Sequence, residues 1–151
     1  MATLLEVGFW RQTEGDRLDQ RPHPRALQDP SWFAEHPALA TRVISYLRTR
    51  GCVESYEMGY SFCRLGLDCA PKEMGACTMT DGVYCWPEGY AHYLQAHHVR
   101  PPQELVDHIC NEPPDAPPRT QLWMWDHETN NAVPMPLDMQ AMILAHTTIT
   151  I

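Results

Sequence analysis

The stretch from Thr80 to Tyr93 constrains the fold more than any other part of the sequence. Asp81-Gly82 is typical of a tight hairpin turn, because both residues tolerate the positive φ angles that such turns require. Val83–Trp86 has strand character, and Pro87 suits the first position of a helix. These residues therefore predict a turn, a strand and a helix start in immediate succession.

Further helices are predicted where apolar residues recur at helical spacing between proline and glycine boundaries. Pro30 and Pro37 are both placed as helix starts, and the apolar residues between Pro37 and Gly51 share one helical face. In the helix that starts at Pro87, His97 belongs to the inward stripe, whereas His92 points elsewhere. The main predicted helices cover residues 38–50, 87–99, 102–110 and 137–146.

Short strands are predicted from β-branched and aromatic residues bounded by turn-forming residues. We expect an α+β fold, with a small, mainly antiparallel sheet packed by three or four helices. Residues 1–151 are expected to form a single domain with a mobile loop at 11–29 and a proline-rich strap at 111–118. The predicted strands cover residues 4–10, 53–60, 61–67, 78–80, 83–86 and 122–126, and the tail 147–151 is rich in β-forming residues.

The negative charge is concentrated in the C-terminal third of the chain. The formal net charge is −8; residues 1–100 carry 12 acidic and 10 basic residues, whereas residues 101–151 carry 7 acidic and 1 basic residue. Such a surface repels a phosphate backbone, so we expect no binding to nucleic acid. A protein partner with a basic surface fits this charge better, although net charge also serves solubility alone.

The sequence shows no basic and apolar leader at its start and no run of about 18 apolar residues. We therefore expect a cytoplasmic protein that does not bind membranes. In that compartment the six cysteines are expected to be free thiols rather than three disulfides. The cysteines are Cys52, Cys63, Cys69, Cys77, Cys85 and Cys110.

Structural zinc is one alternative for four of these cysteines, Cys63, Cys69, Cys77 and Cys85. Their spacing departs from the short Cys-x2–4-Cys pairs of known structural sites. His92 and His97 are five residues apart, about 140° around a helix, which predicts that they do not bind one ion from one face. We therefore expect no metal and no other cofactor, with buried reduced cysteines as the simpler interpretation.

Two further groups of residues are candidates for chemistry or binding. The candidate catalytic residues are His92, Asp81, Glu88, Cys63 and Arg64, and of the first three only His92 lacks a structural explanation. Asp81 is explained by the turn, and Glu88 by the positive end of the following helix. The candidate binding surface pairs aromatic residues from two strands, Tyr84 with Trp86 and Trp123 with Trp125, although such residues are more often part of a core.

The motif Thr80-Asp81-Gly82, then Trp86-Pro87-Glu88-Gly89 and His92-Tyr93, resembles small uncharacterised bacterial proteins that share a TDGxxxWPEGxxHY core. The resemblance covers about residues 60–110 and includes the upstream pair Cys63-Arg64. In those proteins a second cysteine closely follows the Cys-Arg pair, whereas here residues 65–68 intervene before Cys69. The resemblance implies a bacterial source and carries no catalytic role.

The sequence favours a non-enzymatic protein-interaction module, inhibitory or accessory, whose acidic C-terminal third binds a basic partner. One alternative is a small hydrolase that uses His92 with Asp81 or Glu88, or a Cys63 thiolate. Another is a structural zinc-binding protein. A homodimer formed through an edge strand or through Trp123 and Trp125 is also left open.

Overall fold

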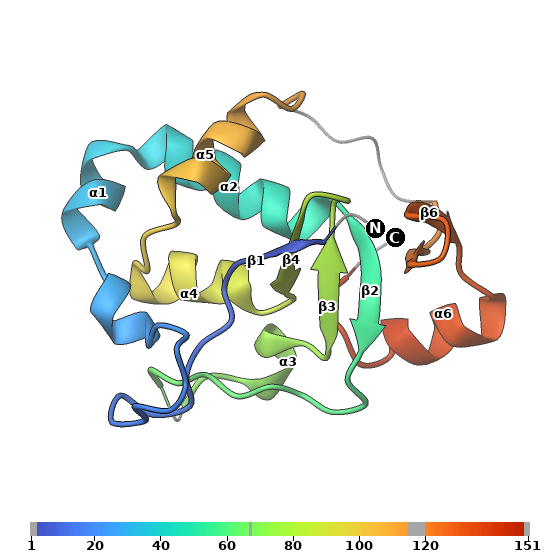
Figure 1. Cartoon of the computed structure of the whole chain (residues 1–151), viewed down its shortest axis with the longest axis horizontal. Helices are drawn as coiled ribbons and strands as arrows, with labels where there is room; N and C mark the ends of the chain where they lie inside the picture. Colours follow the sequence, from blue (N-terminus) through green and yellow to red (C-terminus); the bar gives the residue numbers. More distant parts are fainter. Residues whose placement is uncertain (1–2, 67, 115–119, 150–151) are drawn as a thin grey trace.

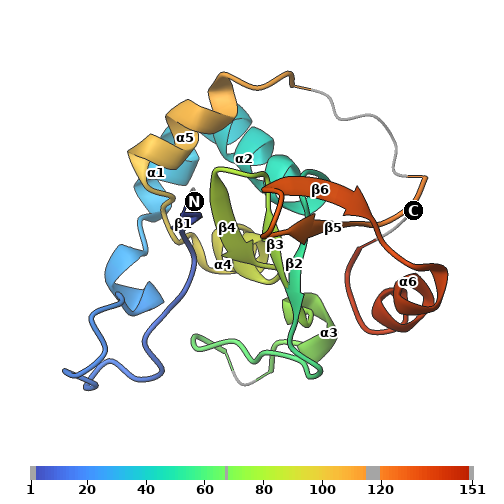
Figure 2. The same ribbon diagram turned by 45° about the vertical axis from the view of Figure 1, so that its right-hand side comes forward.

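The computed structural model describes residues 3–66, 68–114 and 120–149, which form a mixed six-stranded sheet with helices around it (Figure 1). The predicted α+β class is confirmed. In both views α1, α2, α4 and α5 form one group, and α6 lies apart from them beyond β2 (Figures 1 and 2). The helices are α1 (Pro30–Glu35), α2 (Pro37–Thr49), α3 (Pro71–Met74), α4 (Tyr90–His97), α5 (Gln103–Cys110) and α6 (Leu137–Leu144), with a 3-10 helix, η1, at Pro24–Leu27.

The strand order in the sheet is β1-β4-β3-β2-β5-β6. The β2–β3, β3–β4 and β5–β6 pairs are antiparallel, whereas β1–β4 and β2–β5 are parallel. Antiparallel pairing therefore predominates, as predicted. The strands are β1 (Leu5–Glu6), β2 (Cys52–Tyr56), β3 (Cys77–Thr80), β4 (Tyr84–Pro87), β5 (Trp123–Asp126) and β6 (Asn131–Pro134).

The turn at Asp81-Gly82 joins β3 to β4, as the sequence predicts. Gly82 has a φ of 94°, a conformation that favours glycine. The helix prediction from Pro87 is wrong by three residues. Pro87 is the last residue of β4 and pairs with Thr78 of β3, and α4 begins only at Tyr90.

Several other element predictions need correction. The first strand is limited to β1, and residues 61–66 contain no strand in the described chain, while residue 67 lies outside it. In the predicted tail, residues 147–149 are not a strand and residues 150–151 are not described.

Within the excursion 11–29, η1 is regular, and the N–H of Arg11 donates to the carbonyl of Pro22. Residues 111–114 of the strap contain no helix or strand beyond the end of α5, and residues 115–118 are not described.

Helix α4 is fixed by aromatic packing. Tyr90, Tyr93 and Leu94 are almost completely buried. The ring of Trp10 packs edge-on against Tyr90 and Tyr93, with centroids 5.8 and 5.5 Å away. This packing fixes the rotation of α4 about its axis, and with it the direction in which the remaining side chains of α4 point.

No helix among the described residues has the length and apolar character needed to cross a membrane.

The carboxylate of Asp81 joins the hairpin turn to α2 and α5. One oxygen accepts hydrogen bonds from the backbone N–H groups of Val83 and Tyr84. The other accepts from the hydroxyl of Tyr46 at 2.5 Å and lies 2.7 Å from Nε2 of His108. Burial alone would raise the pKa of Asp81, but these hydrogen bonds outweigh burial and lower it below its ordinary value.

We predict that Asp81→Asn lowers the free energy of unfolding by about 1.5–3 kcal/mol at neutral pH, because the ionised acceptor is lost. The lowered pKa means that ionised Asp81 stabilises the fold above about pH 3.8, and that this contribution is lost as the pH falls through the folded-state pKa. The difference between the two proteins should therefore shrink in acid. Urea unfolding at several pH values measures it, with Asp138→Asn on the exposed start of α6 as the control.

Candidate metal centre

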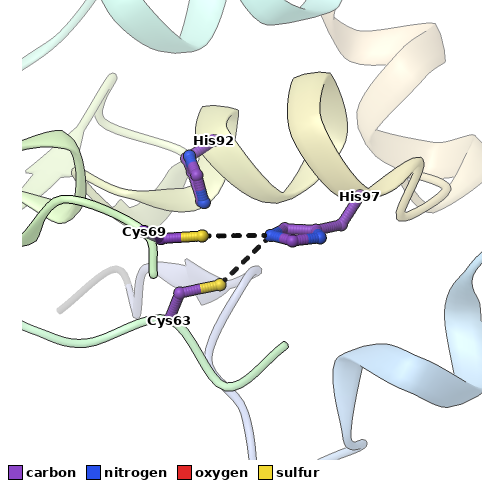
Figure 3. Close-up of side chains that lie close together, drawn as sticks. All are labelled: Cys63, Cys69, His92 and His97. Carbon is purple, nitrogen blue, oxygen red and sulfur yellow. Dashed lines mark hydrogen bonds between the residues drawn. The ribbon is translucent and has the colours of Figure 1, made fainter. Parts of the chain in front are cut away.

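Four side chains converge between α4 and the segment that joins β2 to β3. They are Cys63, Cys69, His92 and His97, and their potential ligand atoms all lie within 4.8 Å of one another. Figure 3 shows the two sulfur atoms facing the ring of His97, and the ring of His92 lies above the sulfur atom of Cys69 in that view. Two cysteines from an irregular segment and two histidines from one helix thus surround a common point.

The irregular segment is joined to α4 by a hydrogen bond directly after Cys63, and a second hydrogen bond orients the Cys63 thiol within the segment. The backbone N–H of Arg64 donates to the hydroxyl of Tyr93, which lies in α4 between the two histidines. The backbone N–H of Leu65 donates to Sγ of Cys63 at 3.4 Å. These contacts fix the position and orientation of the Cys63 thiol against the helix.

Gly66 lets the backbone approach the second thiol. A Cβ atom at this position would lie only 2.8 Å from Sγ of Cys69, closer than a carbon and a sulfur atom can pack. Any other residue would force the Cys69 side chain or the backbone to move. The absence of a side chain at Gly66 therefore helps to position the Cys69 thiol.

The distances between sulfur and nitrogen suit a tetrahedral ion. Sγ of Cys63 lies 3.3 Å and Sγ of Cys69 lies 3.6 Å from Nε2 of His97. Ligands bound to tetrahedral Zn²⁺ at normal bond lengths are about 3.3–3.8 Å from one another. Both sulfur-to-nitrogen distances match this spacing.

His92 offers the fourth potential ligand atom, and its other ring nitrogen faces a carboxylate. Its Nδ1 lies 3.2 Å from Oε2 of Glu73, a residue of α3. Its Nε2 is buried and has no hydrogen-bond partner among the described residues. A carboxylate that holds one ring nitrogen while the other remains available is the usual arrangement of a metal-binding histidine.

The sequence-based exclusion of the His92 and His97 pair is wrong. The five-residue spacing separates their Cα–Cβ directions by about 140°, but it does not separate the ring nitrogens by the same angle, because both side chains lean toward the loop. The two ring centroids are 5.1 Å apart. His97 also ends α4, since His98 adopts the left-handed conformation with a φ of 53°.

The pKa values show the effect of burial at this centre. Burial lowers the pKa of His97, and the rings of His92 and His98 lower it further, so the ring is neutral at neutral pH. Burial raises the pKa of Cys69, and Cys63 beside it raises it further. A bound cation would reverse the second effect, because coordination deprotonates a thiol.

The other two cysteines of the candidate zinc quartet lie elsewhere, within the sheet. Cys77 in β3 and Cys85 in β4 are buried. Burial raises the pKa of the Cys77 thiol to about 12 and that of Cys85 to about 11. Cys63 and Cys69 are therefore the two candidates that meet histidines, and Cys77 and Cys85 serve as small core residues.

The candidate catalytic residues are not assembled into one acid–base group. The ring of His92 faces Glu73, whereas Asp81 binds Tyr46 and His108. Glu88 does not stabilise the start of α4 as the sequence suggested. Its buried carboxylate accepts hydrogen bonds from the backbone N–H groups of residue 76 and of residue 77, where β3 begins, and from the backbone and hydroxyl of residue 148.

The four candidate binding aromatics do not form one surface. Trp86 is completely buried, and its indole N–H donates to the carbonyl of Leu47. Tyr84 is half-buried, and its ring lies 5.1 Å from that of His108. Trp123 is exposed, and it lines a hollow of about 300 Å³ with Trp125. Of the four, the β5 pair lines a common hollow, and Trp86 is not accessible to a partner.

Two sequence signals could have indicated the metal centre. His92 and His97 have four residues between them, which falls within the His-x3–5-His spacing of structural zinc sites. Gly66 lies between the two cysteines that the structure brings together. Glu73 carries no sequence signal, because only the placement of α3 against α4 brings it to His92.

Comparisons with protein-family models, curated proteins and solved structures found no match to this chain.

Proposed function

We propose that this protein binds one Zn²⁺ ion through Cys63, Cys69, His92 and His97, and that the ion is structural. The observation that carries the proposal is the buried Nε2 of His92, which lacks a partner among the described residues and faces a space bordered by two thiols and Nε2 of His97. A buried polar atom without a partner is unfavourable, and a metal bond would satisfy it.

The donor set favours zinc over other common ions. Two thiolates and two imidazoles are ligands that suit tetrahedral Zn²⁺, whereas Mg²⁺ and Ca²⁺ require oxygen ligands. Two thiolates also neutralise the charge of a divalent cation. A neutral complex is less costly to bury than an isolated charge, and Cys63 and His92 are both buried.

Four protein ligands favour a structural role over a catalytic one. Catalytic zinc sites usually have three protein ligands and keep one position open for water or substrate. Here the fourth position is supplied by the protein itself. Zinc would tie the segment 57–76 to α4. Among the described residues of this segment, the short helix α3 is the only regular element.

The hydrolase alternative has less support. A Cys63 thiolate would be 3.3 Å from Nε2 of His97, but Cys63 is only 5% exposed, which leaves little access for a substrate. His92 has neither Asp81 nor Glu88 as its carboxylate partner. Metal binding uses all four converging side chains, whereas a cysteine–histidine pair uses two.

The protein purified without chelators is predicted to contain about one zinc atom per chain by elemental analysis. Gly66→Ala should reduce the zinc affinity by roughly tenfold or more, because the added carbon displaces Sγ of Cys69. Competition with a chromogenic chelator measures that affinity.

Gly15→Ala is the matched control, since a Cβ atom there meets no other atom within 4 Å. Its zinc content and affinity should equal those of the unmodified protein. Purified protein that neither contains zinc nor binds added zinc would refute the proposal. Equal affinities of the two alanine variants would refute the role given to Gly66.

A second proposal concerns the acidic C-terminal third as a binding surface for a basic protein partner. The charge asymmetry supports it, and so do the exposed apolar side chains of Leu137 and Met142 beside Asp138 in α6. A structural zinc ion is compatible with such a non-enzymatic role.

We predict that a partner captured from a source lysate at low salt is released at 0.5 M salt, where the Debye length is about 4 Å. Immobilised protein with mass spectrometry of the eluate tests this. Capture that resists salt, or no capture at all, would contradict an electrostatic interaction.

A further inference from the structure

A second feature, separate from the metal centre, is a cavity of about 640 Å³ between the N-terminal segment 8–21 and the segment 57–64. Its lining includes the aromatic side chains of Phe9, Trp10, Tyr60 and Tyr93. Binding pockets for small molecules are typically of this size, mostly apolar, with a few polar groups that orient the ligand. The cavity is therefore large enough for a molecule with one aromatic ring.

Two hydrogen-bond donors that belong to lining residues of this cavity lack acceptors. Nε of Arg64 and Nε1 of Trp10 are both buried and have no partner within the described chain. Trp10 is only 6% exposed. Both residues contact Tyr93, since the Trp10 and Tyr93 rings are 5.5 Å apart and the backbone of Arg64 donates to the Tyr93 hydroxyl. Both residues therefore line the cavity and lie next to Tyr93.

Arg64 differs from Arg21, the other arginine of the lining, because it has no acidic partner among the described residues. Arg21 forms an ion pair with Asp19 at 2.8 Å. Asp16 accepts hydrogen bonds from two backbone N–H groups, and Glu57 accepts from two hydroxyl groups. Within the described residues, no carboxylate forms an ion pair with Arg64. Its Nη1 donates to the carbonyl of Phe62, its guanidinium lies 5.2 Å from the centre of the Phe62 ring, and its side chain also interacts with the Tyr93 hydroxyl. Nε of Arg64 is therefore a buried donor for which the described part of the chain supplies no acceptor.

We propose that this cavity binds a small aromatic carboxylate. The carboxylate would accept from Nε of Arg64 and from the indole N–H of Trp10, and the ring would pack among Phe9, Tyr60 and Tyr93. A carboxylate suits a guanidinium because it accepts two hydrogen bonds in the plane of that group. The inference does not depend on zinc, because none of the four metal ligands lines the cavity.

Titration of the ¹⁵N-labelled, zinc-treated full chain with phenylacetate tests the proposal. The probe should shift the indole N–H signal of Trp10 saturably, with the signal assigned from the spectrum of Trp10→Phe. Phenylacetamide has the same shape without the charge, and it should bind at least about tenfold more weakly, because hydrogen bonds to ionised groups are the stronger ones.

Arg64→Gln should weaken phenylacetate binding by a similar factor, whereas Arg48→Gln, which alters an exposed arginine of α2, should leave it unchanged. Three results would each overturn the proposal: no saturable shift with phenylacetate, equal binding of phenylacetamide, or unchanged binding by a folded Arg64→Gln variant. The comparison of the two probes uses the unmodified protein, so it stands even if Arg64→Gln does not fold.

Discussion

The attachment of the segment 57–76 to α4 is the constraint on which the functional part of this structure depends. Backbone hydrogen bonds from Glu57 to Ala76 and from Ser61 to Gly75 join the two ends of the segment. Its middle is held by side chains, through the Tyr93 hydroxyl and the Cys63, Cys69, His92 and His97 cluster. A structural ion is a common way for proteins to stabilise a segment that buries little apolar surface.

The hydrophobic core places two of the four ligands before any metal binds. Burial of Tyr90, Tyr93 and Leu94 fixes the rotation of α4, and the ring of Trp10 packs against both tyrosines. His92 then faces the loop, with Glu73 behind it. On another side of Tyr93, the same packing helps form the cavity next to Arg64. One helix thus contributes to both candidate sites, so damage to its packing should affect both.

Local sequence signals predicted the elements they determine directly. The Asp81-Gly82 turn, the helix after Pro37 and the strand containing Trp123 and Trp125 all depend on neighbouring residues, and the structure has each of them. The predicted start of α4 is too early because proline also fits the end of a strand. Proline has no backbone N–H, and Pro87 occupies the last position of β4.

The metal centre depends on contacts between residues far apart in the chain, and this is why the sequence pattern did not reveal it. Cys63 and His97 are 34 residues apart, and their contact depends on how an irregular segment lies on α4. Helical angles describe where side chains leave the backbone, and they do not describe where long side chains meet. Glu88 illustrates the same limit, since its partners come from residues 76 and 77 and from residue 148.

One zinc ion is proposed to join the irregular segment to α4. Anomalous diffraction from crystals of the protein, recorded on both sides of the zinc absorption edge, tests this most directly. We predict a single strong peak within bonding distance of Sγ of Cys63, Sγ of Cys69, Nε2 of His92 and Nε2 of His97. The absence of a peak at this position, or a peak bound by other residues, would contradict the account.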